Sequence, residues 1–335
     1  MKVFLYTEAE KAIRKSGLGK AIEHQKKACE LVGVPYTKNK DDDWDILHIN
    51  TYFAKSFFVA RRARKKGKKV VYHAHSTEED YKDGFILAKQ TSKLFKWWLV
   101  KCYKQGNVLI TPTEYSKKLI SSYRGLTNKK IYPISNGIEL DFFKCDKELG
   151  KKFREIYNIK DNEKVIISIG LYIERKGIVD FVELAKRMPE YKFIWFGYSS
   201  LMFSTRKAKK AVKTKLDNLI FAGYVERDMI MSALNGCDLY IFPTLEETEG
   251  IPIVEALACK TKAIVRDIPV FDPWLVDGKN VYKAKDVDEF EIKIKKILNN
   301  ELPDLTEEGY KVAEERDLKS IGIQLKEVYE SLEKE

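Results

Sequence analysis

Cysteine is scarce in this chain of 335 residues, and its five cysteines are spread along the whole sequence. They are Cys29, Cys102, Cys145, Cys237 and Cys259. No two of them have the C-x-x-C spacing that is typical of zinc or redox sites. The sequence therefore argues against a disulfide framework and favours reduced thiols in a cytosolic compartment.

Long hydrophobic runs are also missing. No apolar stretch reaches the roughly 18 residues that a membrane-spanning helix needs, and the opening residues Met1–Tyr6 are typical of a β-strand rather than a signal peptide. No strand-like run is followed by G-x-G-x-x-G, which argues against a dinucleotide oxidoreductase. Repeats of solenoid length are absent as well. Together with the lack of long apolar runs, this indicates a globular protein without a membrane span.

Acidic residues are in short supply in the first half of the chain only. Residues 1–144 contain 29 Lys and Arg but 15 Asp and Glu, a net charge of +14. Residues 145–335 contain 32 Lys and Arg and 35 Asp and Glu, a net charge of −3. This asymmetry points to an anionic partner for the first half, either a membrane surface or a nucleic acid.

Short β-type runs alternate with helical stretches along the chain, which is the pattern of parallel sheets joined by helices. We expect six strands in each half, at Lys2–Tyr6, Val34–Thr37, Ile46–Asn50, Val70–Ala74, Val108–Pro112 and Ile131–Ser135, then at Val165–Gly170, Phe193–Gly197, Leu219–Gly223, Leu239–Pro243, Ala263–Asp267 and Asn280–Lys283. The fold class is therefore α/β, with two similar doubly wound domains that meet near Ser135–Phe143.

An acidic loop follows the expected strand Leu239–Pro243 and leads into a helix. Glu247 in this loop and Glu255 in the helix are separated by seven residues. This spacing resembles the E-x7-E signature of the retaining GT-B glycosyltransferases of family 4. The resemblance implies that Glu247 lies beside the donor sugar and that Glu255 holds the ribose hydroxyls of the nucleotide, a task that suits a carboxylate because it accepts two hydroxyl donors at once. An acidic loop that merely offsets a helix dipole is the alternative interpretation.

The same resemblance implies further donor-site residues. The segment Gly170–Gly177 is similar to the family's G-R-L-x-x-x-K-G, with Lys176 in the lysine position and Leu171 in place of the arginine. We expect Arg175 to supply the missing charge, because the departing nucleoside diphosphate develops negative charge that fixed cations stabilise. A cationic loop without a role is the alternative. The remaining donor-side candidates are Gly197, Val225, Thr248, Glu249, Gly250 and Ile251.

In the first half, a glycine loop and two histidines are the candidate site residues. Gly17 and Gly19 open a helix where close backbone approach to a diphosphate is possible, although turn glycines are the simpler interpretation. His73 and His75 end a strand on one face, and the family has a histidine in this loop near the donor sugar. His75 is preferred as the catalytic residue because it lies nearer the strand end, and His73 is kept as a substrate-binding residue.

The resemblance spans nearly the whole chain and implies the GT-B fold, two Rossmann-like domains that face a central cleft. Residues 1–143 would form the acceptor and membrane-binding domain, and residues 144–317 the nucleotide-sugar domain. A helix at about 318–335 would pack back on the first domain.

Segments such as His73–Asp80 and Glu247–Ile251 resemble those of bacterial monoglucosyldiacylglycerol synthases. This implies transfer of glucose from UDP-glucose to diacylglycerol, with retention of the α configuration, on an anionic membrane at the cytoplasmic side. No metal is expected to be required in the site, although Mg²⁺ could stimulate the reaction. A family 4 enzyme with another UDP-sugar or a soluble or polyprenyl-linked acceptor is the alternative. A non-catalytic basic module is disfavoured, because nucleic-acid binding needs none of these site residues.

Two basic stretches are candidate membrane-docking helices. In Ala54–Lys66, helical spacing groups Phe58 with Arg61, Arg62, Lys65 and Lys66, while Val59, Ala60 and Ala63 lie opposite. In Phe85–Lys104, the spacing predicts an outward face and an inward face. The outward set is Lys89, Lys93, Lys96 and Lys104 with Ile86, Trp97 and Val100; the inward set is Leu87, Leu94, Phe95 and Trp98. Apolar and basic residues on one face suit a helix in the headgroup layer, whereas solvated lysines are the alternative.

Overall fold

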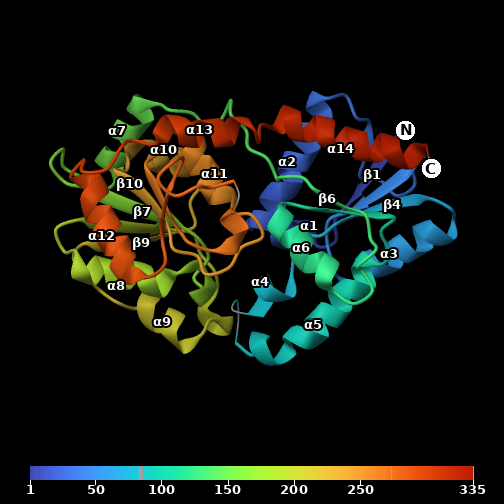
Figure 1. Ribbon diagram of the computed structural model, residues 1–335, viewed down its shortest axis with the longest axis horizontal. Coiled ribbons are helices and arrows are strands. Elements are labelled where there is room, and N and C mark those ends of the chain that lie inside the picture. Colours follow the sequence, from blue (N-terminus) through green and yellow to red (C-terminus); the bar gives the residue numbers. More distant parts are fainter. Residues whose placement is uncertain (83, 85, 273, 335) are drawn as a thin grey trace. The chain divides into compact units, whose positions relative to one another are not determined.

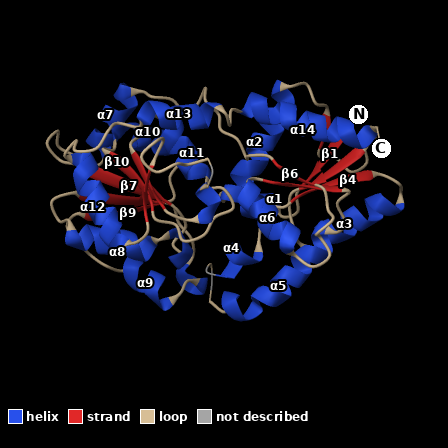
Figure 2. Ribbon diagram, in the orientation of Figure 1, coloured by secondary structure: helices blue, strands red, loops and turns tan. Residues whose placement is uncertain are grey.

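The computed structural model describes residues 1–82, 84, 86–272 and 274–334. The chain divides into two compact units (Figure 1). The first comprises Met1–Tyr81, Gln90–Glu139 and Arg316–Glu335, and the second comprises Leu140–Glu315 with the short stretch Lys82–Lys89. In each unit the strands lie in the middle and helices cover both faces (Figure 2).

The first sheet has six strands in the order β2-β1-β3-β4-β5-β6. The strands are β1 (Val3–Tyr6), β2 (Tyr36–Thr37), β3 (Ile46–Ile49), β4 (Lys69–His73), β5 (Val108–Thr111) and β6 (Ile131–Pro133). The helices are α1 (Glu10–Ile13), α2 (Gly17–Leu31), α3 (Ala54–Lys65), α4 (Glu78–Lys82), α5 (Ala88–Tyr103), α6 (Glu114–Ser122) and α14 (Leu318–Glu333). Each pairing between the described strands of this sheet is parallel, which explains why the strands are apolar runs rather than alternating patterns.

The second sheet also has six strands, in the order β12-β11-β10-β7-β8-β9. The strands are β7 (Val165–Ile169), β8 (Lys192–Phe196), β9 (Leu219–Gly223), β10 (Leu239–Phe242), β11 (Ala263–Arg266) and β12 (Tyr282–Ala284). The α-helices are α7 (Lys147–Ile156), α8 (Ile178–Arg187), α9 (Arg206–Val212), α10 (Arg227–Gly236), α11 (Ile251–Ala258), α12 (Val287–Leu298) and α13 (Thr306–Glu314), and the short 3₁₀ turns are η1 (Glu174–Lys176), η2 (Leu201–Phe203) and η3 (Pro269–Phe271). The prediction of two doubly wound α/β units with six strands each is confirmed.

The C-terminal helix α14 packs in the first unit, where it lies along α2 (Figure 1). Gly322 permits this close approach, because a Cβ at that position would overlap the Ala28 carbonyl of α2. Leu325, Tyr329 and Leu332 of α14 are almost fully buried. The far end of the chain therefore completes the core of the unit in which the chain begins.

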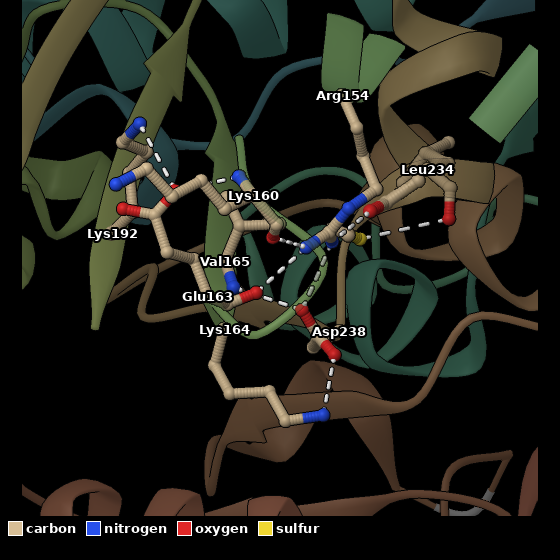
Figure 3. Close-up of polar contacts among 10 residues, drawn as sticks. Arg154, Lys160, Glu163, Lys164, Val165, Lys192, Leu234 and Asp238 are labelled. Carbon is tan, nitrogen blue, oxygen red and sulfur yellow. Dashed lines mark hydrogen bonds and ion pairs between the residues drawn. The ribbon is translucent and has the colours of Figure 1, made fainter. Parts of the chain in front are cut away.

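A polar cluster holds α7 against the amino ends of β7 and β10 in the second unit (Figure 3). Arg154 donates from Nη2 to the carbonyls of Lys160 and Glu163, both at 2.7 Å, and from Nη1 to Asp238 Oδ2 at 3.3 Å. Asp238 Oδ2 also accepts from the Val165 amide at 2.9 Å. The Arg154 guanidinium thus connects α7, the loop that follows it and the amino ends of the central strands β7 and β10.

Candidate active site

The arrangement of β7 and β10 marks where the second sheet can bind a ligand. These strands are neighbours, although β8 and β9 lie between them in the sequence. The chain leaves β7 towards one edge of the sheet and leaves β10 towards the other, so the strand order reverses between them. Ligands of doubly wound sheets bind outside the carboxyl ends of the strands at such a switch point. Arg175 and Lys176 follow β7 there, and Glu247 follows β10.

Glu247 is the centre of a buried ionic cluster. Its side chain is 7% exposed, and Lys176 Nζ donates to its Oε1. Arg175 Nη1 lies 3.7 Å from the other oxygen, Oε2, and donates to the Glu246 carbonyl at 2.7 Å. Thr244 Oγ1 lies 3.0 Å from Glu247 Oε1 and is also buried. The structure therefore brings together the three donor-side charges that the sequence singled out.

The charge state of Glu247 follows from these neighbours. Burial by itself would raise the pKa of the carboxyl group, but the charges of Lys176 and Arg175 and the hydrogen bonds from Lys176 and Thr244 outweigh it and hold the pKa below its usual range. A carboxylate that stays ionised accepts hydrogen bonds from hydroxyl groups and does not serve as a general acid.

Two loops are joined at this point by backbone contacts. The Leu245 amide donates to the Arg175 carbonyl at 2.7 Å. Gly177 has a φ of 79°, and a Cβ there would overlap the Pro243 carbonyl. The glycine after Lys176 is thus required because the loops after β7 and β10 touch, which fixes the lysine opposite the glutamate.

Helix α11 carries the second glutamate of the pair. Gly250 precedes the helix with a φ of 94°, and Glu255 is 1% exposed within it. Tyr240 of β10 lies near both carboxylates: burial and then the charges of Glu255 and Glu247 raise the pKa of its phenol. The remaining acidic-loop candidates differ in burial, since Glu249 and Ile251 are buried and Thr248 is half-buried.

Gly197 follows β8 where three strand ends approach closely. Its φ is 109°, its amide donates to the Gly223 carbonyl at 2.7 Å, and a Cβ there would overlap the Gly170 carbonyl. The ends of β7, β8 and β9 therefore meet backbone to backbone next to the cluster. Val225, two residues beyond β9, is half-buried in the same series of loops.

Three of the four histidines, His48, His73 and His75, form a polar network in the first unit, with His48 and His73 buried and His75 half-buried. His73 and His75 stack with ring centroids 3.8 Å apart, so they share a face as predicted. His48 Nε2 lies 3.2 Å from His73 Nδ1, and His48 Nδ1 lies 2.7 Å from the hydroxyl of Tyr329 on α14. His75 Nε2 lies 3.2 Å from Asn50 Oδ1. Among the described residues, His73 Nε2 is buried without a hydrogen-bond partner.

All three rings are held in the neutral form. Burial lowers the pKa of His75 to about 3. Burial and the neighbouring His75 lower the pKa of His48 to about 3, and burial, His75 and His48 lower that of His73 well below its ordinary value. A neutral imidazole can donate one hydrogen bond to a sugar hydroxyl without adding a positive charge.

The two glycines of the first loop have different surroundings. Ser16 Oγ accepts from the Gly19 amide at 3.2 Å and caps α2. A Cβ at Gly19 would overlap the Ile13 and Arg14 backbone, whereas nothing lies within 4 Å of a Cβ at Gly17. The packing of the first helical turn accounts for Gly19, and Gly17 stays a candidate for ligand approach.

Sequence reasoning missed four polar residues of the histidine network. They are Gln25, His48, Asn50 and Tyr329, all of which are buried. A signal was available, because His48 lies within an apolar strand and Asn50 follows it directly, and buried polar atoms must find partners. Thr244, which follows Pro243 in the loop after β10, was missed as well.

The predicted docking face of α3 is exposed. Phe58 is 61% exposed, and Arg61, Arg62, Lys65 and Lys66 are exposed with it. Ala60 and Ala63 are buried on the opposite side, and Val59 packs partly against the core.

For α5 the predicted faces were partly wrong. Lys96 is only 35% exposed, lies 2.9 Å from Glu78 Oε2, and sits over the Tyr123 ring at 4.2 Å. Leu87 and Leu94 are 62% and 65% exposed instead of packed. The reason is the phase of the helix: its buried stripe runs through Ala88, Ser92, Leu99, Cys102 and Tyr103.

The outward side of α5 therefore carries Lys89, Lys93, Leu94 and Trp97. Phe95 and Trp98 pack partly against the core as predicted, and so does Val100, which was expected outside. Phe85, where the predicted helix began, lies outside the described residues.

Two general features bear on the chemistry. Within the described part of the chain, no group of three or more His, Cys, Asp or Glu side chains could hold a metal ion. None of the helices that the structure describes is both long and apolar enough to cross a membrane.

Two glycosyltransferase family models match this chain. Residues 150–316 match the family model "Glycosyl transferases group 1", and residues 36–142 match "Glycosyltransferase Family 4". The chain is 39% identical over 332 residues to a processive diacylglycerol alpha-glucosyltransferase of Acholeplasma laidlawii, which covers 99% of this chain and 98% of the relative. An alpha-monoglucosyldiacylglycerol synthase of the same organism is 27% identical over 257 residues, covering 70% of this chain and 62% of the relative.

Solved structures share the fold. The Anabaena protein HepE, crystallised with UDP and glucose, has a TM-score of 0.77 at 16% identity and covers 98% of this chain and 99% of its own. A sucrose-phosphate synthase from Thermosynechococcus elongatus has a TM-score of 0.72, also at 16% identity, covering 98% of this chain and 80% of its own.

Proposed function

Because the chain belongs to the family 4 glycosyltransferases with the GT-B fold, we propose that it transfers glucose from UDP-glucose to 1,2-diacylglycerol. The product is α-monoglucosyldiacylglycerol. The observation that carries this proposal is the 39% identity, over almost the full length of both chains, to a diacylglycerol alpha-glucosyltransferase.

The buried cluster at the switch point suits a nucleotide-sugar donor. Lys176 and Arg175 supply two positive charges where the diphosphate of UDP would lie, and these charges stabilise the leaving group as it becomes more negative. Glu247 stays ionised and accepts hydrogen bonds from hydroxyls of the glucose. Glu255, one turn into α11, accepts hydrogen bonds from the ribose of the nucleotide.

The first unit offers the neutral histidines as candidate contacts for the sugar. His75 is the proposed catalytic contact to the glucose, and His73 is a substrate contact. The acceptor hydroxyl attacks the anomeric carbon from the face that UDP leaves, and its proton passes to the departing phosphate oxygen as the bond to UDP breaks, which retains the α configuration. No metal ion takes part in the site, and stimulation by Mg²⁺ is tested by adding EDTA to the assay.

The acceptor lies in a bilayer, so the proposal includes docking of the first unit on an anionic membrane at the cytoplasmic side. The α3 face offers four basic residues and an exposed phenylalanine. Each basic residue near such a surface contributes ~1 kcal/mol, so the four give several kcal/mol that salt would screen. The exposed side of α5, with Lys89, Lys93, Leu94 and Trp97, also combines basic and apolar side chains that suit the headgroup layer.

A charge-reversal pair tests the docking face. Lys65→Glu with Lys66→Glu should weaken sedimentation with anionic vesicles, because it removes two attractive charges and adds two repulsive ones. The matched control is Lys11→Glu with Lys118→Glu, which makes the same change on α1 and α6. Equal vesicle binding by both pairs would favour a soluble or polyprenyl-linked acceptor.

Addition of a second glucose is a second candidate activity. The relative that is 39% identical is named a processive enzyme, whereas the monoglucosyl synthase is 27% identical. A time course separates the two activities: one glucose per lipid at completion indicates a single transfer, and growth of diglucosyl lipid indicates processive transfer.

The proposal is tested with purified protein, a panel of UDP-sugars and diacylglycerol in anionic vesicles. UDP-glucose should be consumed with formation of glucosyldiacylglycerol. Preference for another UDP-sugar, or transfer only to a soluble or polyprenyl-linked acceptor, would select the alternative within the family.

A further inference from the structure

Between Tyr191 and Leu216 the second half of the chain contains seven basic residues and no acidic one. The rest of residues 145–335 has 25 basic and 35 acidic residues, a net charge of −10. A stretch of one charge sign within an acidic half is therefore a local feature, and it does not follow from the overall composition.

The structure gathers most of these charges on the outer side of α9, which packs beside α8 (Figure 1). Ala208 and Ala211 are buried in the core of the unit, while Arg206, Lys210 and Lys213 are exposed. No ion pair is found for these three side chains in the part of the chain that the structure describes. Helix α9 thus presents a cationic face that other parts of the described unit do not neutralise.

Exposed apolar side chains accompany this charge. Met202 is 70% exposed, the highest fraction among the large hydrophobic residues described, and Tyr198 is 58% exposed. Both belong to the connection between β8 and α9. We name Tyr198, Met202, Arg206, Lys207, Lys210 and Lys213 the α9 patch.

The α9 patch is fixed to the loop that carries the donor-side cations. Thr205 Oγ1 donates to Glu174 Oε2 at 2.8 Å, and Lys207 Nζ lies 3.6 Å from Glu174 Oε1. Ser204 Oγ donates to the Tyr172 carbonyl at 2.8 Å. Glu174 directly precedes Arg175 and Lys176, so the patch is connected to the segment that carries both donor-side cations.

We propose that the α9 patch is a second membrane-docking surface, which holds the second unit on an anionic lipid bilayer independently of α3 and α5. Cations combined with an exposed methionine and tyrosine suit the headgroup layer, where apolar side chains enter the acyl boundary and cations meet lipid phosphates. This inference rests on the proposed lipid acceptor. The hydroxyl of that lipid stays at the bilayer surface, so the donor site must come to the surface for transfer to occur.

The test compares two variants of the full chain that remove three charges each. The patch variant carries Arg206→Gln, Lys210→Gln and Lys213→Gln. The control carries Lys151→Gln, Lys186→Gln and Lys311→Gln, which changes the net charge equally on exposed sites of the same unit. Each cation near an anionic surface strengthens binding by about fivefold, so the patch variant should lose roughly 100-fold in partition to phosphatidylglycerol-containing vesicles.

The expected pattern has three parts. The patch variant loses vesicle binding and activity on vesicles, keeps wild-type activity on diacylglycerol dispersed in neutral detergent, and melts at the wild-type temperature. The control variant binds vesicles as the wild type does. Separately, Met202→Ser should weaken binding to anionic and neutral vesicles alike.

Several results would overturn the inference. Wild-type vesicle binding by the patch variant would do so, and so would an equal loss in the control. Loss of binding to an RNA homopolymer with vesicle binding intact would assign the patch to nucleic acid instead. The proposed function fails separately, if the wild type binds vesicles through the patch but forms no glucosyldiacylglycerol.

Discussion

Replacing Lys176 with methionine removes the charge that contacts Glu247 while keeping most of the side-chain volume. Among the described residues, Glu247 would then keep Arg175, at 3.7 Å, and the Thr244 hydroxyl, at 3.0 Å, as side-chain partners. At an effective dielectric constant of about 20, the attraction between two unit charges about 4 Å apart is about 4 kcal/mol, before the cost of desolvation is subtracted. Because Arg175 remains, we expect a net loss of stability of about 2 kcal/mol, below the 3–5 kcal/mol typical of a buried pair broken outright.

The effect on catalysis should be larger than the effect on folding. Loss of one preorganised charge that stabilises a transition state typically costs about 3–4 kcal/mol, or 10²–10³ in rate. The assay is glucosyl transfer at saturating UDP-glucose, with stability measured by denaturant unfolding of the same preparation. Lys186→Met on α8 is the matched control, since that lysine is 47% exposed and pairs with Glu183 on the same helix instead of Glu247.

A double-mutant cycle with Glu247→Gln tests whether the two side chains act as a pair. Each single variant leaves one member of the Lys176–Glu247 pair without the other, whereas the double variant removes both, so the stability losses should be less than additive by at least about 1 kcal/mol. Additivity within about 0.5 kcal/mol, together with turnover of Lys176→Met close to wild type, would refute the pairing and the site assignment.

Three further predictions concern other parts of the molecule. Glu255→Gln should raise the KM for UDP-glucose more than it lowers kcat, because its ribose bonds exist before and during the reaction; steady-state kinetics that show the opposite split would contradict this role. His48 is buried with a pKa lowered to about 3, so between pH 6.5 and 3 the unfolded chain binds a proton that the folded chain does not. His48 should by itself lower the stability by about 1.4 kcal/mol per pH unit in this window, in addition to the contributions of His73 and His75, and His48→Gln should therefore make the acid limb of an unfolding-versus-pH curve less steep; an unchanged slope would count against the neutral buried ring. Arg154→Ala should cost about 3 kcal/mol, because it removes the donor that Asp238 shares with the carbonyls of Lys160, Glu163 and Gly236, with little effect on the KM of a folded preparation; urea melts and kinetics check both parts.

Most of the fold could be predicted from sequence because the strands are buried on both faces. Runs such as Val165–Ile169 and Leu239–Phe242 contain almost no polar side chain, and each is followed by a turn or a helix. The strand ends were less accurate. The second strand begins at Tyr36 instead of Val34, because only Tyr36 and Thr37 pair with β1.

The candidate site could be located from local spacing, but its contacts could not. The seven residues between Glu247 and Glu255 and the lysine–glycine pair at 176–177 lie within short segments. That Lys176 contacts Glu247, 71 residues away, depends on the strand order that makes β7 and β10 neighbours. Likewise, the contact between His48 and Tyr329 spans 281 residues.

The faces of α5 show a different limit. Spacing alone gives the period of a helix but not which side meets the core when apolar residues surround it. Leu94 and Trp97 are apolar yet exposed, while Ser92 is polar yet buried, where it donates to Glu78 at 3.1 Å. A buried polar pair therefore set the phase that the apolar residues did not reveal.

The central claim is tested most directly by the structure of the product. Purified protein is incubated with UDP-glucose and diacylglycerol in anionic vesicles, and the lipid product is isolated for NMR analysis of its anomeric centre. We expect glucosyldiacylglycerol with the α configuration, formed in step with UDP release. A β-linked product, or release of UDP without a glucosylated diacylglycerol, would contradict the central claim.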